Sequence, residues 1–485
     1  MAYRIPLYFC IALLCWANYA LLAQTTPKSS SSMDSRVDKL VAPYFESGQM
    51  MGATVGVIRD GEVWIKGYGS LSRNQPEVTP DGNTVFEIGS ISKVFTGLLL
   101  ADSVTRQKVR LDQTLGELVT DLKNKNEKAA AIRLLDLTHH KSGLPRMPNN
   151  ANPQSAEFPF ENYDWKLMKE FLESVALNGK PGEKYTYSNY AVGLLGTVLA
   201  RNEDRTYENM IQQQIFKPLK MESSSTVVSE NLKPRLAPPH LASLETTSEF
   251  SFNAMKGAGG IRSTVNDMIK FMQANLNAPE DQLGKSIELA WKKQMEAGQD
   301  HRAMGLGWMI AGDGHTRWHN GQTNGYHSMM LVSRKLNTGV ILLTNTATME
   351  ADVLTEQIFR MVAANSNEEP RKFDKLADIE IAVMDRLVGK YRLSLFAVME
   401  VTRKEDRLLV QLTGQQALRV FPENETTWNY RDVKAQLKFE MGDQGPASKV
   451  TLFQNGRELV ATRIQDQKKA SNSGSLKDIK PSETQ

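Results

Sequence analysis

A serine and a lysine stand three residues apart in an apolar segment, FEIGSISKVFTGLLL, residues 86–100. If this segment is a helix, the Ser90 hydroxyl and the Lys93 amine lie on one face and can touch. Free serine is a weak nucleophile, but a neighbouring neutral amine can take its proton. Burial favours that neutral form, because it lowers a lysine pKa from about 10.4. The pair therefore indicates a nucleophile, Ser90, and a proton acceptor, Lys93; the alternative is a capping serine beside a lysine that reaches solvent.

A second polar group precedes another apolar segment, in PGEKYTYSNYAVGLLG, residues 181–196. A tyrosine beside a cation can ionise, so Tyr187 is a candidate general base and acid. Asn189 has an amide that can hold both Lys93 and a substrate. The alternative is a plain turn with an aromatic anchor.

A third group, His319-Asn320-Gly321 followed by Gln322, stands where a strand is expected, in RWHNGQTNGYHSMMLVS, residues 317–333. Glycine in a strand permits a close backbone approach to a ligand. Histidine is mostly neutral at pH 7. The alternative is a histidine in a turn. The seven histidines of the chain contain no H-E-x-x-H pattern, and we expect no metal or cofactor.

The elements that must position these groups alternate between strands and helices. Two strands turn at Asp60-Gly61, a hairpin dipeptide, and a β-branched strand covers 339–347. Strands at both ends with helices between them predict one α/β domain whose sheet is built from both ends. The apolar spacing predicts helices at 90–106, 164–176, 190–201, 264–276 and 353–365.

Changes in composition predict several parts along the chain. After about residue 380, short alternating strands with regular turn signals predict a small all-β domain. The predicted parts are a signal peptide, 1–23; a flexible tether, 24–35; the α/β domain, 36–365; a linker, 366–379; the all-β domain, 380–465; and a disordered tail, 466–485.

The first residues are typical of an export signal, with Arg4, an apolar stretch, and Gln24 after the expected cleavage near Ala23. We therefore expect a periplasmic or secreted protein; the alternative is an uncleaved membrane anchor. The only cysteines, Cys10 and Cys15, lie in this segment, so the remainder has no disulfide and no thiolate nucleophile. The net charge of +3 without a basic block argues against a nucleic-acid partner.

Taken together, the three polar groups resemble those of the penicillin-recognising serine hydrolases. FEIGSISK is similar to the active-site signature of class C β-lactamases, and three more stretches resemble that family and its peptidase and esterase relatives. The resemblance covers roughly residues 36–365 and implies an antiparallel sheet flanked by helices. The β-rich end is similar to the lipocalin-like barrel of some D-peptidases. The three further stretches are LLDLTHHKSGLP, 134–145; GAGGIRSTVNDMIKF, 257–271; and MGLGW, 304–308.

The resemblance also implies roles for single residues. Ser90 is the nucleophile, Lys93 the proton acceptor, Tyr187 the general base and later acid, and Asn189 positions the amide. The backbone N–H groups of Ser90 and Gln322 would form the oxyanion hole. The expected reaction cleaves an amide of a β-lactam or D-amino-acid peptide, including peptidoglycan fragments, through an acyl-enzyme. An esterase and a binding protein without turnover are the alternatives.

The chain departs from the family pattern on one strand. His319, Asn320 and Gly321 replace a Lys-Thr-Gly sequence whose lysine binds the substrate carboxylate. Family members with histidine there are often esterases or D-aminopeptidases, so the departure argues against efficient β-lactam turnover.

Overall fold

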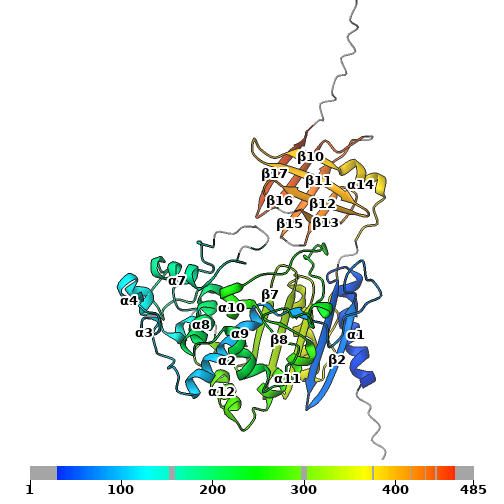
Figure 1. The fold of residues 1–485 in the computed structure, drawn as a ribbon. Helices are drawn as coiled ribbons and strands as arrows, with labels where there is room; N and C mark the ends of the chain where they lie inside the picture. The colour runs from blue at the N-terminus through cyan, green and yellow to red at the C-terminus, as the bar shows by residue number, and fades with distance from the viewer. Residues whose placement is uncertain are drawn as a thin grey trace, which may run out of the picture. The chain divides into compact units, whose positions relative to one another are not determined.

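The computed structural model describes residues 30–464, except 152–157, 159, 297–302, 374–375, 416, 432 and 443–444. The chain divides into two compact units between Asp374 and Lys375. Figure 1 shows the first unit in blue to yellow and the second in orange to red. The predicted signal peptide, 1–23, and the tail, 466–485, lie outside the described residues. None of the helices in the described part of the chain is long and apolar enough to cross a membrane.

The first unit is built on one antiparallel sheet in the order β2-β1-β9-β8-β7-β6-β5. Strands from the two ends of the unit meet where β1 pairs with β9, which confirms the predicted α/β domain with a sheet built from both ends. The strands are β1 (Gly52–Arg59), β2 (Glu62–Gly69), β5 (Ala303–Met304), β6 (Met309–Ile310), β7 (Thr316–Gln322), β8 (His327–Ser333) and β9 (Thr338–Thr344), with a separate pair β3 (Phe86–Glu87) and β4 (Arg262–Ser263).

The predicted hairpin is present between β1 and β2. Arg59 pairs with Glu62, and the two turn residues both have positive φ, 51° at Asp60 and 89° at Gly61. Asp and Gly tolerate this backbone conformation, so the dipeptide sets the register of the hairpin.

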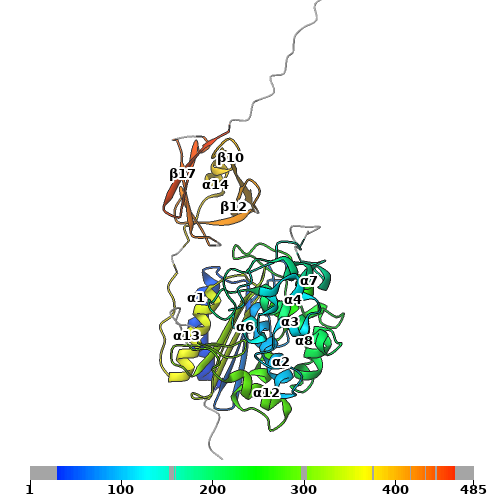
Figure 2. The same cartoon turned by 90° about the vertical axis from the view of Figure 1, so that its left-hand side faces the viewer.

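Helices cover both faces of the sheet. Figure 2 shows α1 (Ser30–Glu46) and α13 (Glu350–Ala364) on one side and the remaining helices of the unit on the other. Alternate residues of β8 and β9 enter the two resulting cores, because successive strand side chains point to opposite faces. Met329 and Leu331 face α1 and α13, whereas Met330 and Val332 face the larger helical layer.

The predicted helices appear close to their expected bounds, which confirms the 3.6-residue periodicity. The main helices of the larger layer are α2 (Ser92–Thr105), α7 (Trp165–Ser174), α8 (Asn189–Asn202), α11 (Val265–Leu276) and α12 (Gln282–Trp291). Shorter helices are α3 (Leu115–Leu118), α4 (Leu122–Lys125), α5 (Glu127–Ala130), α6 (Leu134–Thr138), α9 (Tyr207–Ile211), η2 (Gln212–Phe216), η3 (Lys233–Arg235), η4 (Asn253–Met255) and α10 (Lys256–Gly259).

The predicted tether, 24–35, is wrong from Ser30 onward, because helix α1 begins there. The helix is held by an apolar stripe of Val37, Leu40, Val41 and Tyr44, all buried against the sheet. Packing of these four residues stabilises the helix, and the helix extends toward the N-terminus into polar serine-rich residues. The composition of those residues alone favours no regular structure.

The second unit is a closed barrel of eight strands with a filled interior. Tyr391, Trp428 and Phe439 are buried in its core. One helix, α14 (Ile381–Leu387), precedes the strands, so the domain predicted at 380–465 is not purely β. The strands are β10 (Gly389–Arg392), β11 (Val398–Lys404), β12 (Arg407–Leu412), β13 (Leu418–Pro422), β14 (Thr427–Tyr430), β15 (Ala435–Glu440), β16 (Lys449–Gln454) and β17 (Arg457–Arg463).

The predicted linker, 366–379, contains the division between the units, but its ends are anchored. Phe373 packs edge-on against Tyr44 with ring centroids 4.9 Å apart, and Arg371 forms an ion pair with Glu350. At the other end Ile379 is buried in the barrel core. Only the middle of the predicted linker therefore separates the two units.

Candidate active site

Ser90 lies in a 3₁₀ turn, η1 (Gly89–Ile91), that leads directly into α2. Ser90 is partly exposed, whereas Ser92 and Lys93 in the first turn of α2 are buried. The predicted helix thus begins with a tighter turn, which keeps Ser90 and Lys93 on the same face.

Lys93 contacts three oxygen atoms, one from nearby Ser90 and two from distant parts of the chain. Its Nζ lies 2.8 Å from Ser90 Oγ, 2.8 Å from Asn189 Oδ1 and 2.6 Å from the carbonyl oxygen of Ala258. None of these partners is a carboxylate. The site therefore lacks the negative charge that would hold a buried lysine in its ammonium form.

The pKa of Lys93 is held well below its ordinary value, first by burial and then by the positive charge of Arg146. A neutral amine has two N–H groups and one lone pair. The oxygens of Asn189 and Ala258 can accept the two N–H groups, which leaves the lone pair for the Ser90 hydroxyl. The surroundings of Lys93 therefore favour a proton acceptor.

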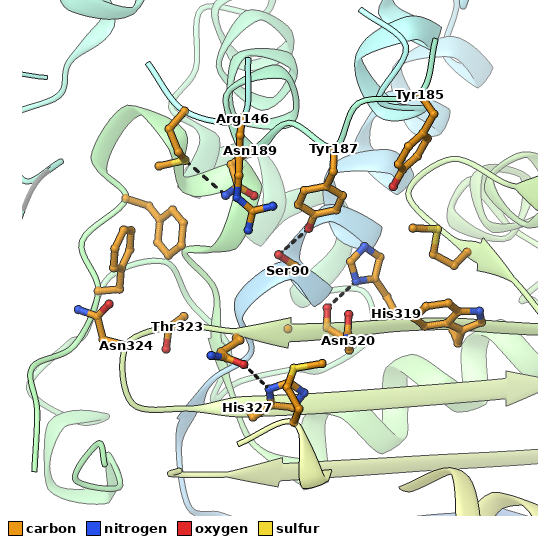
Figure 3. A pocket seen from close by; sticks show the side chains of 18 of the residues that line it. Ser90, Arg146, Tyr185, Tyr187, Asn189, His319, Asn320, Thr323, Asn324 and His327 are labelled. Atoms are coloured by element: carbon orange, nitrogen blue, oxygen red, sulfur yellow. Dashed lines mark hydrogen bonds between the residues drawn. The ribbon is translucent and has the colours of Figure 1, made fainter. Parts of the chain in front are cut away.

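Tyr187 approaches Ser90 from the other side, and its hydroxyl donates to Ser90 Oγ at 2.8 Å (Figure 3). Burial raises the pKa of Tyr187 to about 12, although the Ser90 hydrogen bond and Arg146 both lower it. Tyr187 is therefore a protonated phenol at neutral pH. The expectation that a nearby cation ionises Tyr187 is wrong for this resting arrangement, because desolvation outweighs the charge.

The ring of Tyr187 is held by residues to which the sequence analysis assigned no role. His140 stacks on it with ring centroids 4.4 Å apart, and the guanidinium of Arg146 lies 5.2 Å from its centroid. His140 is kept neutral, because burial lowers its pKa well below the ordinary value. His140 lies inside the LLDLTHHKSGLP stretch and Arg146 directly follows it, so that motif was the available signal.

Asn189 is the first residue of α8, and the chain before it is fixed by several hydrogen bonds. Ser188 caps the helix by accepting from the N–H of Ala191 at 2.9 Å, while its hydroxyl donates to the carbonyl of Pro145. The backbone N–H of Asn189 donates to the carbonyl of Arg146 at 3.0 Å. These bonds orient the Asn189 side chain toward Lys93.

Strand β7 passes unusually close to the turn that carries Ser90. A Cβ on Gly321 would stand 2.6 Å from the Ser90 nitrogen, and one on Gly89 would stand 2.7 Å from the Gln322 nitrogen. Both positions therefore require glycine, and Gly89 also has a φ of 49°. The close approach predicted for Gly321 is made to the chain around Ser90, and it brings the Ser90 and Gln322 backbones together.

His319 is buried on the same face of β7, with 2% of its surface exposed. Its Nδ1 lies 2.6 Å from the carbonyl oxygen of Asn320. Burial and the nearby Lys93 lower the pKa of His319 to about 4. His319 is therefore neutral at physiological pH and supplies no cation to the site.

The Asn320 side chain was predicted to contact substrate, but in the structure it binds a carboxylate instead. Its Nδ2 donates to Asp352 Oδ2 at 2.7 Å, in helix α13 on the opposite side of the sheet from α2. Alternate residues of a strand face opposite sides, so Asn320 points away when His319 and Gly321 face Ser90. The alternation of side chains along a strand could have predicted this orientation of Asn320, but the motif comparison did not take it into account.

Gln322 and His327 continue the network around Asp352. Gln322 Oε1 lies 3.1 Å from His327 Nδ1, and His327 Nε2 lies 2.7 Å from Asp352 Oδ1. Asp352 therefore holds β7 through Asn320 and β8 through His327, on either side of the segment that approaches Ser90.

These groups border one cavity of about 880 Å³ (Figure 3). Ser90, Tyr187 and Asn189 lie on one side and strand β7 on the other, as Figure 3 shows. Aromatic side chains form much of the remaining lining, among them Tyr185, Phe250, Phe252 and Trp318.

Metal ligands are not gathered here. His315 and His319 stand four residues apart, but His315 directly precedes strand β7 and His319 lies within it, where this spacing does not pair two ligands as it does on a helix. Within the described residues, no three His, Cys, Asp or Glu side chains are arranged to hold a metal ion.

The sequence of residues 37–364 matches the Beta-lactamase family. This match covers more than half of the chain, and the chain belongs to that family of serine hydrolases. The fold agrees with this family, because the chain superimposes on the D-alanine carboxypeptidase AmpC from Burkholderia cenocepacia with a TM-score of 0.61. That likeness covers 70% of this chain and 100% of the other at 20% identity.

Two curated relatives are similar in sequence. The chain is 26% identical over 285 residues to a protein named Beta-lactamase from Yersinia enterocolitica, covering 56% of this chain and 68% of the relative. It is 26% identical over 439 residues to Penicillin-binding protein 4* from Bacillus subtilis (strain 168), covering 82% of this chain and 91% of that relative. The second similarity spans more of the chain than the first unit contains, so it extends into the barrel unit.

Proposed function

We propose that this chain cleaves an amide bond, in a β-lactam or a D-amino-acid peptide, through an acyl-enzyme on Ser90 in the manner of class C β-lactamases. The observation that carries the proposal is that Ser90 Oγ lies 2.8 Å from both Lys93 Nζ and Tyr187 Oη. One of these partners is suited to take a proton and the other to give one. The names of the two curated relatives support the same class of substrates.

In acylation, the lone pair of Lys93 takes the hydroxyl proton as Ser90 Oγ attacks the substrate carbonyl. The N–H groups of Ser90 and Gln322 stabilise the oxyanion that develops. Tyr187 gives its proton to the departing nitrogen, which would otherwise be a poor leaving group. The products of this step are an acyl ester on Ser90, an ammonium on Lys93 and a phenolate on Tyr187.

Deacylation uses the two changed groups in reverse. The Tyr187 phenolate takes a proton from water, which attacks the ester, and Lys93 returns its proton to Ser90 Oγ. Each residue ends in its starting state. The charges of Lys93 and Arg146, 5.0 and 5.2 Å from the ring centroid, stabilise the phenolate between the two steps.

An esterase is the second candidate, and the neutral His319 favours it. Strand β7 presents no cation at the position where the family pattern has lysine, so it gives no charge-based preference for carboxylate-bearing amides. An ester also needs less help from Tyr187, because an alkoxide or phenolate leaves more easily than an unprotonated amide nitrogen, which would have to leave as an anion.

Burst kinetics on the purified protein separate these functions. A fast release of product followed by steady turnover of a D-alanyl peptide or a penicillin supports the amidase. Turnover of an activated ester alone supports the esterase, and a burst without turnover supports a binding protein.

Ser90→Ala should lose all covalent labelling by a fluorophosphonate, with the exposed Ser174→Ala as control. Labelling that persists in Ser90→Ala would refute the acyl-enzyme.

We also propose that the protein acts outside the cytoplasm, as the sequence of residues 1–23 suggests. Cell fractionation with N-terminal sequencing tests this. An exported chain beginning near Gln24 would support the proposal, and a cytoplasmic chain that keeps residues 1–23 would refute it.

A further inference from the structure

The cavity beside Ser90 has one fully charged group on its lining. Among its described lining residues, Arg146 is the only Lys or Arg, and none is Asp or Glu. Lys93 lies beneath this lining, buried and bonded to Ser90, Asn189 and Ala258. The charge that an entering substrate meets is therefore the guanidinium of Arg146.

Among the described residues, no carboxylate is paired with the guanidinium of Arg146. It is exposed, and within the described residues it makes no ion pair and no side-chain hydrogen bond. Its guanidinium stacks on Tyr187, with the guanidinium carbon 5.2 Å from the ring centroid. Stacking orients the guanidinium but leaves its five N–H donors available.

The backbone of Arg146 is firmly placed although its side chain is exposed. Its carbonyl accepts the N–H groups of Asn189 and Tyr190, at 3.0 and 3.2 Å, at the start of α8. Figure 3 shows Arg146 beside Asn189 and Tyr187, across Ser90 from strand β7. The guanidinium thus faces the part of a bound substrate that points away from β7.

We propose that Arg146 is a specificity-determining residue that binds a carboxylate on the acyl part of the substrate, on the wall opposite strand β7. A planar guanidinium can grip a carboxylate with two parallel hydrogen bonds, and such charge-assisted bonds are stronger than neutral ones. The inference rests on the proposed acyl-enzyme, because it requires an acyl group bound over Ser90. It predicts a preference for dicarboxylic half-esters or half-amides over their uncharged counterparts.

The test compares two esters with the same leaving group, p-nitrophenyl hydrogen glutarate and p-nitrophenyl methyl glutarate. In the full-length protein, kcat/KM should be higher for the hydrogen glutarate. Arg146→Gln should lower kcat/KM for this acid about tenfold or more beyond the loss for the methyl ester, because the effect of Arg146 on Tyr187 and Lys93 is common to both esters. Arg146→Lys should keep part of the preference for the acid, because the lysine ammonium retains the positive charge but not the two parallel hydrogen bonds of the guanidinium.

Arg201→Gln is the matched control, since Arg201 also stacks on an aromatic ring, 4.6 Å from the centroid of Trp165, but does not line the cavity. It should leave the acid-to-ester ratio unchanged. An equal ratio in the wild type and Arg146→Gln, or an equal loss for both esters, would overturn the assignment of Arg146 and leave the acyl-enzyme standing.

Failure of the wild type to hydrolyse either ester would count against the proposed function instead. The role of Arg146 is then measured by binding of 3-carboxyphenylboronic acid and its methyl ester, which need a reactive Ser90 but no turnover. A preference for the acid that disappears in Arg146→Gln supports the proposal. Equal binding of the two compounds by the wild type, or no binding of either, refutes it.

Discussion

His327 Nε2 lies 2.7 Å from Asp352 Oδ1, on the side of strand β7 that faces away from Ser90. The other oxygen of Asp352 accepts from Asn320. Asp352 therefore joins two strands on either side of the loop that begins after Gln322. Because Gln322 belongs to the segment packed against Ser90, this carboxylate positions one predicted oxyanion donor without touching substrate.

Asp352→Ala should lower kcat about tenfold with a smaller change in KM, since a displaced donor weakens transition-state stabilisation more than ground-state binding. The circular dichroism spectrum should stay that of the wild type. Glu356→Gln on the same helix, where Glu356 is half exposed and 3.9 Å from Arg360, is the control. A kcat equal to that of the wild type would show that Asp352 has no positioning role.

Lys93→Met should lower the rate by about a hundredfold or more, because methionine keeps the length of the side chain but cannot accept a proton. In the wild type, kcat/KM should rise as pH passes upward through the lowered pKa of Lys93 and then stay level while Tyr187 keeps its proton. It should fall again as Tyr187 loses its proton near pH 12. Stopped-flow acylation measures the rising limb and the plateau, and Lys108→Arg serves as an exposed control. Near-normal rates in Lys93→Met would remove Lys93 from the mechanism.

His319 should not contribute charge between pH 6 and 8, because its pKa of about 4 leaves it neutral throughout that range. The ratio of rates for a carboxylate substrate and its neutral ester should therefore stay constant from about pH 6 to 8. Parallel pH profiles measure this. A selective gain for the carboxylate substrate toward pH 6 that is lost in His319→Gln would mean that His319 binds the carboxylate as a cation.

Glu87 should make stability depend on pH. It is buried beside Arg262 at 2.8 Å, and burial raises its pKa to about 7, so the folded protein retains a proton that the unfolded chain loses near pH 4.5. The stability of the wild type should fall relative to Glu87→Gln by about 3 kcal/mol as pH rises from 4.5 through 7. Urea unfolding at pH 4.5 and 8 measures this difference.

Glu288→Gln is the matched control for Glu87→Gln, because Glu288 pairs with Arg334 at 2.8 Å but is half exposed. The difference in unfolding free energy between Glu288→Gln and the wild type should change far less between pH 4.5 and 8. If the difference in unfolding free energy between Glu87→Gln and the wild type is also the same at pH 4.5 and 8, Glu87 is ionised in the folded protein throughout this range.

A chain that ends at Asp374 should fold and hydrolyse a small activated ester. Among the described residues, the two cores of the first unit contain none beyond Phe373, and the barrel core begins at Ala377. Thermal unfolding and ester hydrolysis of the shortened chain test this expectation. Loss of folding would mean that the units depend on one another, and a folded but inactive chain would mean that the barrel contributes to the reaction.

The local elements and the three polar groups could be predicted from the sequence, because both depend on short-range patterns. The helix carrying Lys93 and the hairpin at Asp60-Gly61 follow from apolar spacing and turn chemistry within a few residues. The order of Ser90, Tyr187 and His319 along the chain was sufficient for the family resemblance. The start of α1 was not predicted, since its serine-rich first residues carry no apolar periodicity of their own and the buried stripe of the helix begins only at Val37.

Only the tertiary structure determines the protonation states of Lys93 and Tyr187 and the direction in which the side chains of the site point. Lys93 is a suitable proton acceptor because residues far along the chain, Asn189 and Ala258, surround it with neutral oxygens and exclude water. Tyr187 keeps its proton because its burial outweighs the effect of Arg146. A pKa depends on burial and on charges within a few ångströms. Those neighbours are brought together by folding, so a sequence names the groups but does not determine their charge.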